Sequence, residues 1–203
     1  MPLDLPNLLT ISRILAIPLL VALVAIQTPA GDLAACALFS LAAITDYFDG
    51  KIARDRKITS DFGRMLDPIA DKLLVGATLM LLAGYGRLDG LALLPAIVIL
   101  LREILVSGLR EYLAGLRVGL PVTALAKWKT GFQMGALGVL LAGDTGAALI
   151  GLGALPVGRL GEVMLWIAAA LTLLTGWDYW TAGLRHARPN PGAEAAAPDK
   201  TSP

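Results

Sequence analysis

Apolar residues gather in six segments along the chain, separated by Gly, Pro or charged residues and centred near residues 19, 38, 79, 97, 138 and 169. A helix needs roughly 20 residues to cross the hydrocarbon core of a bilayer. The uninterrupted apolar stretches are shorter, as Ile14–Ile26, Leu33–Ile44 and Val163–Gly176 illustrate. Each segment reaches full length only when polar residues at one end are included. The pattern therefore predicts an all-α chain of six transmembrane helices, each polar at one end.

Basic residues are distributed unequally between the connections of these helices. If the N-terminus is cytoplasmic, the opposite loops contain only Arg87 and Arg159, whereas the cytoplasmic segments contain Lys51, Arg54, Arg56, Lys57, Arg64, Arg110, Arg117, Lys127, Lys129, Arg185, Arg188 and Lys200. Cytoplasmic loops of membrane proteins carry an excess of Lys and Arg. We therefore expect both termini in the cytoplasm. The polar helix ends then share one leaflet, which predicts a polar cavity open to the cytoplasmic side.

The composition agrees with a membrane domain. Of the 203 residues, 56% are hydrophobic and 16% are charged, which is more apolar surface than a soluble domain of this size can bury. The single cysteine, Cys36, excludes a disulfide within the chain, and the single histidine, His186, leaves no histidine-based metal site. We expect the membrane domain over residues 1–186. Residues 187–203, rich in Pro, Ala and Gly, are expected to form a disordered cytoplasmic tail.

Six aspartates lie in the stretch Thr45–Lys72, between the second and third apolar segments, and four of them form two closely spaced pairs. Asp46 and Asp49 are three residues apart, and Asp67 and Asp71 are four apart, so on helices each pair would share one face. Carboxylates gathered at the ends of two adjacent helices repel one another unless a positive charge lies between them. Oxygen ligands of this kind suit a hard divalent cation such as Mg²⁺ or Mn²⁺.

In full, the stretch reads Asp46-x2-Asp49-Gly50-x2-Ala53-Arg54-x8-Gly63-x3-Asp67-x3-Asp71. This pattern resembles, at every position, the signature of the CDP-alcohol phosphotransferase family, and the resemblance covers about the first 185 residues. It implies that Asp46, Asp49 and Asp67 bind Mg²⁺ or Mn²⁺, with two ions expected. It also implies that Asp71, near the metal as well, is the catalytic general base that acts on the acceptor alcohol.

The other positions of the signature have physical reasons of their own. Gly50 and Ala53 lack bulk, so a nucleotide could approach the helix backbone closely. Arg54 offers a planar fork of donors that can pair with a phosphate. Gly63 relieves crowding where the loop returns towards the third helix, and Pro68 fits either a helix start or a kink. The residues expected to bind the CDP-linked lipid are Asn7, Thr10, Asp49, Gly50, Ala53, Arg54 and Gly63.

Three further stretches narrow the acceptor. The opening LPNLLTISRILAIP, the segment REILVSGLREYLAG (Arg102–Gly115) and the segment KWKTGFQ (Lys127–Gln133) look like the phosphatidylglycerophosphate synthase branch, whose acceptor is sn-glycerol 3-phosphate. Arg102 and Arg110 are eight residues apart, about two helical turns, and can share a broad helix side. With Lys127 or Lys129 they could form an anion pocket for the acceptor phosphate.

Each of these basic residues also has a structural interpretation. Arg102 and Arg110 are each followed by a glutamate, with which they could form ion pairs at the membrane interface. Lys127 and Lys129 could determine topology or extend to the interface. Because the two lysines point in different directions on a helix, they cannot line one pocket equally. The sequence leaves open which of them faces inward.

The sequence therefore predicts an enzyme of the bacterial cytoplasmic (inner) membrane, with its active site facing the cytoplasm. It would transfer the phosphatidyl group from CDP-diacylglycerol to glycerol 3-phosphate and release CMP, as a homodimer by family resemblance and with no nucleic-acid partner. The alternative is the same chemistry with inositol phosphate or phosphatidylglycerol as acceptor. A Mg²⁺-dependent prenyltransferase usually has two distant Asp-rich motifs, and no second cluster follows Asp71. A transporter would need polar residues through both leaflets.

Overall fold

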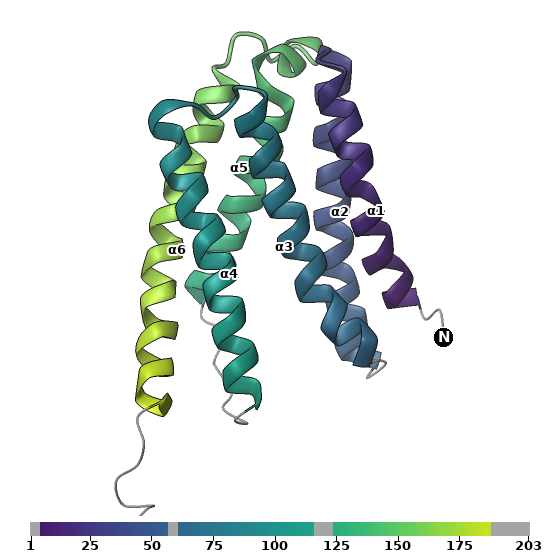
Figure 1. Cartoon of the computed structure of the whole chain (residues 1–203). Helices are drawn as coiled ribbons and strands as arrows, with labels where there is room; N and C mark the ends of the chain where they lie inside the picture. Colours follow the sequence, from purple (N-terminus) through teal and green to yellow (C-terminus); the bar gives the residue numbers. More distant parts are fainter. Residues whose placement is uncertain (1–4, 57–60, 116–123, 188–203) are drawn as a thin grey trace, which may run out of the picture.

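The computed structural model of the chain is a bundle of long α-helices (Figure 1) and describes residues 5–56, 61–115 and 124–187. Within these ranges the structure has no strand. Its elements are α1 (Leu5–Ala25), α2 (Pro29–Arg56), α3 (Asp61–Gly84), the short 3₁₀ helix η1 (Gly90–Ala92), α4 (Leu93–Gly115), α5 (Ala124–Leu149) and α6 (Val157–Ala187). The prediction of an all-α chain with one helix for each apolar segment is confirmed for the described residues.

Four segments in the described part of the chain are long and apolar enough to cross a membrane: Leu8–Ala25, Gly90–Gly115, Leu125–Leu149 and Val157–Trp177. They belong to α1, α4 with η1, α5 and α6. Many large apolar side chains on these helices face outward, among them Leu15, Leu101, Ile104, Leu105 and Leu173. Apolar surface of this extent is typical of contact with lipid. These features are those of an integral membrane protein.

Successive helices run in opposite directions, so six helix ends meet at one end of the bundle, the lower end in Figure 1. This end contains the start of α1, the end of α2 and the start of α3, together with the end of α4, the start of α5 and the end of α6. In packing, α1 contacts both α2 and α3, α6 contacts both α4 and α5, and α2 contacts α5. Fully buried side chains such as Phe39, Leu82, Ile99, Leu137 and Leu165 fill the core between these helices.

The structure places two residues of the aspartate stretch more closely than the sequence did. Pro68 lies inside α3, which begins at Asp61, so of its two interpretations the helix start is excluded. Gly63 lies in the first turn of the same helix and is buried, rather than in the loop before it. Ala187 is the last residue of α6, and residues 188–203, where the sequence predicts a disordered tail, lie outside the described ranges.

At the upper end of the bundle, α5 is interrupted at Gly143, whose φ of 58° and ψ of −178° are not helical. Arg87, in the α3–η1 connection, donates hydrogen bonds to the carbonyl oxygens of Leu140 and Leu141 beside this break. The same guanidinium binds the buried carboxylate of Asp32 at the start of α2. Thr145 donates to the other Asp32 oxygen at 3.0 Å. We call Asp32, Arg87 and Thr145 the upper cluster; it connects α2, α3 and α5.

Candidate active site

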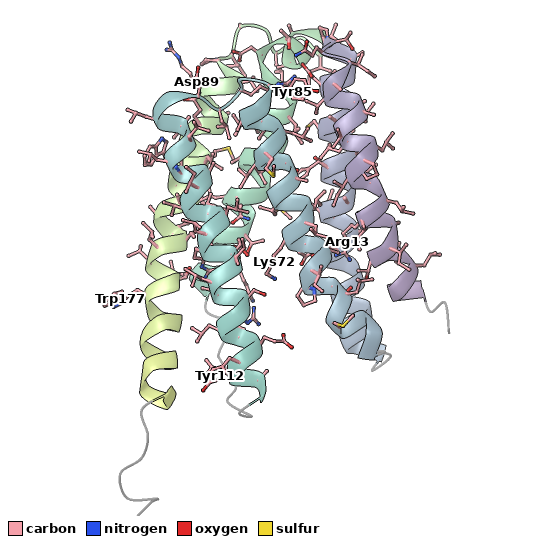
Figure 2. The ribbon with its side chains drawn as sticks, viewed as in Figure 1. Arg13, Lys72, Tyr85, Asp89, Tyr112 and Trp177 are labelled. Carbon is pink, nitrogen blue, oxygen red and sulfur yellow. The ribbon has the colours of Figure 1, made fainter. Side chains whose placement is uncertain are left out.

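One face of α1 holds the aspartates of α2 and α3 together. Thr10 and Arg13, three residues apart, are both buried on this face. Nη1 of Arg13 lies 2.6 Å from Oδ1 of Asp46 and 2.8 Å from Oδ1 of Asp71. Thr10 donates a hydrogen bond from its hydroxyl to Oδ1 of Asp67. Figure 2 shows Arg13 extending from α1 towards the neighbouring helices. Three of the four aspartates are therefore connected through a single helix.

The three carboxylates are more exposed than the arginine that binds two of them. The Arg13 side chain is 2% exposed, whereas those of Asp46 and Asp71 are 33% and 42% exposed. Arg13 therefore lies beneath the carboxylates, which face the open side of the cluster. Among the contacts described for these residues, Arg13 serves two of the carboxylates and the Thr10 hydroxyl serves the third. Carboxylate oxygens gathered on an open side favour the binding of a cation. We call Thr10, Arg13, Asp46, Asp67 and Asp71 the acidic cluster.

The donor set of the acidic cluster suits a hard divalent cation, because every carboxylate supplies oxygen ligands. Within the described side chains, however, no group of three acidic, histidine or cysteine ligands is gathered as a metal site requires. The side chain of Asp49, the fourth aspartate, lies outside this description. The chemistry of the residues fits Mg²⁺ or Mn²⁺, while Arg13 lies between Asp46 and Asp71 in this arrangement.

The helical placement of the motif is as predicted, since Asp46 and Asp49 lie on α2 and Asp67 and Asp71 lie on α3. Of the residues expected to bind the CDP-linked lipid, Thr10 and Gly63 are both buried. The remaining five lie on α1 or α2, and their side chains are outside the described part of the structure: Asn7, Asp49, Gly50, Ala53 and Arg54. Their predicted role in lipid binding remains a prediction.

A second group of charged residues lies where α4, α5 and α6 meet. The Lys129 ammonium donates to Oε1 of Glu103, and Nη1 of Arg102 lies 3.4 Å from the same oxygen. Nη2 of Arg102 donates to the Thr175 hydroxyl at 3.1 Å. Glu103 therefore holds two cations from different helices, and Thr175 fixes one of them from a third. We call Arg102, Glu103, Lys129 and Thr175 the basic cluster.

Two buried polar atoms border the basic cluster. Gln133 lies one turn beyond Lys129 on α5, and Thr172 lies one turn before Thr175 on α6. Neither the Gln133 carbonyl oxygen nor the Thr172 hydroxyl has a hydrogen-bond partner among the described residues. Buried polar groups are normally satisfied by protein, water or ligand. These two atoms are therefore available to a polar ligand or to water beside the basic cluster.

The structure shows which predicted basic residues turn inward. Lys129 is buried at 5% exposure together with Gln133, whereas Lys127 is exposed. Likewise Arg102 is largely buried, and Arg110 is exposed two turns further along α4. The structural alternative for Arg102, an ion pair with Glu103, is present. The fold thus brings Arg102 and Lys129 together and leaves Arg110 and Lys127 at the surface of the same end of the bundle.

Comparison with known proteins identifies the family to which the chain belongs. A family model for CDP-alcohol phosphatidyltransferase matches residues 3–174, which include both clusters except Thr175. The chain belongs to the CDP-alcohol phosphatidyltransferase family. It is 48% identical, over 88% of its length and 94% of the relative's, to the CDP-diacylglycerol–glycerol-3-phosphate 3-phosphatidyltransferase of Rickettsia bellii.

Two other relatives illustrate the range of names among similar proteins. A protein of the same name from Cereibacter sphaeroides is 41% identical over 89% of this chain and 96% of its own length. The cardiolipin synthase (CMP-forming) of Oryza sativa is 43% identical over 69% of this chain and 46% of its own length. The family similarity therefore extends to proteins named for different products.

Some residues at these clusters were not predicted as site residues of this CDP-alcohol phosphatidyltransferase. Arg13 was noted in the opening motif but was not assigned to the site, although a charged residue three positions from Thr10 in an apolar segment signals a buried partner. Glu103 was considered only as a structural partner of Arg102. Lys72, which lies between the clusters beside Asp71, was given no role in the site. Arg13 is the one charged residue of α1, whereas Glu103 and Lys72 each adjoin another charged residue and give a weaker signal.

Proposed function

We propose that the chain transfers the phosphatidyl group from CDP-diacylglycerol to sn-glycerol 3-phosphate, giving phosphatidylglycerophosphate and CMP. The observation that carries this proposal is the 48% identity, over nearly the whole of both chains, to a protein named for this reaction. The arrangement of the site supports it. The acidic cluster on α1–α3 suits a metal ion that binds the pyrophosphate. The basic cluster on α4–α6 suits an anionic acceptor.

In this proposal Asp46, Asp49 and Asp67 would hold Mg²⁺ or Mn²⁺, with Asp71 nearby. When bound, the metal would supply positive charge beside the pyrophosphate of the CDP-linked lipid. Asp71 accepts the proton of the acceptor hydroxyl. The hydroxyl oxygen forms a bond to the β-phosphorus while the bond from that phosphorus to CMP breaks. Arg13 fixes the direction of the Asp71 and Asp46 carboxylates, so the base is oriented before the substrates arrive.

The acceptor phosphate binds at the basic cluster. Arg102 and Lys129 supply two cations from different helices. The Gln133 side-chain carbonyl and the Thr172 hydroxyl, which have no hydrogen-bond partner among the described residues, can bind the glycerol hydroxyl or ordered water. Glu103 keeps the two cations together when no acceptor is bound. Arg110 and Lys127, exposed at the same end, raise the local concentration of anionic substrates as they approach.

We also propose that all six helices cross the membrane, with both termini and the site on the cytoplasmic side, in a homodimer. The charges of the aspartate stretch lower the mean hydropathy of α2 and α3, yet both are as long as the four apolar spans and lie beside them (Figure 1). The helix ends that meet at the lower end carry the basic excess typical of cytoplasmic loops.

The decisive experiment measures CMP release from CDP-diacylglycerol by the purified chain in detergent or nanodiscs, with each alcohol offered separately. Glycerol 3-phosphate should give release that depends on Mg²⁺ or Mn²⁺ and stops with EDTA. Release with phosphatidylglycerol but not with glycerol 3-phosphate would instead support the second candidate, cardiolipin synthesis, which the similarity to the Oryza sativa protein favours. Release with inositol phosphate alone would exclude both.

A further inference from the structure

Lys72 is a charged residue between the two clusters that neither of them includes. It follows Asp71 on α3, and Figure 2 shows its side chain extending from α3 towards α4. Its charge acts electrostatically both on Asp71 of the acidic cluster and on Lys129 of the basic cluster. Lys72 therefore lies between the proposed base, Asp71, and the proposed acceptor pocket at the basic cluster.

The contacts of Lys72 leave its charge available. Its ammonium donates to the carbonyl oxygen of Pro68 at 2.8 Å, a neutral partner one turn earlier on the same helix. No described ion pair involves Lys72, whereas Lys129 and Arg102 are both paired with Glu103. An ammonium group has three donors, so two remain for another ligand. A half-buried cation of this kind binds an anion more strongly than one fully in water.

The size of the acceptor favours a phosphate near the base. In glycerol 3-phosphate a chain of only three carbons separates the attacking hydroxyl from the phosphate. A cation that binds this phosphate must therefore lie close to the group that takes the hydroxyl proton. Lys72 adjoins Asp71 in sequence and faces the helices that carry the basic cluster, whereas Arg110 and Lys127 are exposed.

We propose that Lys72 binds the phosphate of the acceptor, as the cation between Asp71 and the Arg102–Lys129 pair. This inference rests on the proposed function. It makes Lys72 a determinant of specificity, because an uncharged alcohol of the same length would bind without its help. On acceptor binding, the Lys72 ammonium would exchange the Pro68 carbonyl for a phosphate oxygen. That exchange replaces a hydrogen bond to a neutral carbonyl oxygen with one in which donor and acceptor carry opposite charges.

The test compares Lys72→Met, which keeps the length of the stem but loses the charge, with Lys72→Arg, which keeps the charge. For each variant we would measure kcat, the KM for glycerol 3-phosphate, the KM for CDP-diacylglycerol and the rate with glycerol. Lys72→Met should raise the KM for glycerol 3-phosphate about tenfold or more, the loss expected for a hydrogen bond between charged groups. The KM for CDP-diacylglycerol and the rate with glycerol should stay within about twofold of wild type. Lys72→Arg should recover most of the affinity.

Binding of radiolabelled glycerol 3-phosphate to the full chain in nanodiscs gives a readout independent of turnover, and Lys72→Met should weaken it by the same factor. Arg159→Met, which removes an exposed charge at the start of α6, is the matched control and should change nothing. An equal loss with glycerol and glycerol 3-phosphate would place Lys72 at the transferred phosphoryl group and overturn the proposal. Failure of both variants to fold would make Lys72 structural and would overturn it too.

The wild-type chain separates the two proposals. If it releases no CMP with glycerol 3-phosphate, the proposed function fails whatever Lys72 does. If wild-type turnover is normal and Lys72→Met leaves the KM for glycerol 3-phosphate unchanged, only the role of Lys72 fails.

Discussion

The upper cluster and the acidic cluster both pair arginine with aspartate, yet they differ in the number of carboxylates that each brings together. In the upper cluster one carboxylate, Asp32, meets one guanidinium, Arg87, and its second oxygen accepts from Thr145. Nη1 of Arg87 donates to carbonyl oxygens beside the α5 break. In the acidic cluster, three described carboxylates are served by Arg13 and the Thr10 hydroxyl.

This difference separates a structural contact from a binding site. A matched, buried ion pair with all its hydrogen bonds made contributes little net stability, but removing one partner is costly. It therefore fixes a helix arrangement and has no capacity for a ligand. Several carboxylates gathered at one place repel one another, and a bound cation relieves that repulsion. Substitutions at the upper cluster should damage the fold, and substitutions at the acidic cluster should damage the chemistry.

The largest effect is expected for Asp71→Asn. The amide keeps the shape of the side chain but cannot accept a proton, so turnover should fall about 10²–10⁴-fold. The protein should remain folded and should still bind metal and CDP-diacylglycerol, although more weakly. CMP release, together with thermal unfolding and a CDP-diacylglycerol binding assay, would check this. Near-normal turnover would show that Asp71 is not the base.

Asp32→Asn should have the next largest effect, and on stability rather than chemistry. It leaves the Arg87 guanidinium, which is 20% exposed, without its anion, at a cost of about 3 kcal/mol. The unfolding midpoint should drop, while activity per folded molecule stays close to wild type. Asp89→Asn removes the same charge from an exposed residue at the same end and should be neutral. A variant with normal stability and no activity would reverse the roles of the two clusters.

Arg13→Gln should change how the chain responds to metal. Without the guanidinium, the carboxylates of Asp46 and Asp71 repel one another, so the metal-free protein should be less stable. A bound cation then relieves more repulsion, and the rise in unfolding temperature on adding Mg²⁺ should be larger than in wild type. We expect a gain in metal affinity of about tenfold, or about 1.4 kcal/mol, measurable with Mn²⁺ by electron paramagnetic resonance. Ser12→Ala, a neighbouring exposed position, is the control. A smaller metal response would contradict this account.

The smallest effect is expected for Thr10→Val. This substitution keeps the shape of the side chain and removes the hydrogen bond to Asp67, at a cost of about 1 kcal/mol. Turnover should fall only a few-fold, because Arg13 still orients the other two carboxylates. Thr10→Ser retains the hydroxyl and should resemble wild type in both stability and turnover. Complete loss of activity in Thr10→Val would mean that the hydroxyl has a direct role in substrate binding.

The fold was largely predictable from sequence, and the site only in part. The apolar segments predict the helices because each is continuous and bounded by Gly, Pro or charge. The aspartate spacing places each pair on one helix. Which lysine of α5 faces inward depends on how α5 is rotated against α4, and two lysines two residues apart give no preference. Only the packed helices show that Lys129 reaches Glu103.

Contacts between distant positions could not be predicted from the sequence either, because they also depend on how the helices pack. Asp32 and Arg87 lie at different ends of different apolar segments, and nothing local predicts that they meet. The break at Gly143 lies in a segment rich in Gly and Leu, where other glycines remain helical. It exists because a guanidinium from another connection binds the freed carbonyl oxygens. Such a conformation is set by the tertiary partner, not by local propensity.

The position of Thr10 and Arg13 on the first helix has a consequence for how the chain enters the membrane. Neither α2 nor α3 is among the segments apolar enough to span alone, whereas α1 is. If α2 and α3 also cross the membrane, as we propose, α1 precedes both in the chain and presents a buried hydroxyl and guanidinium to their carboxylates. Pairing with α1 would then lower the cost of placing those carboxylates at membrane depth. The first helix would thus serve as an insertion guide for the two helices that follow it.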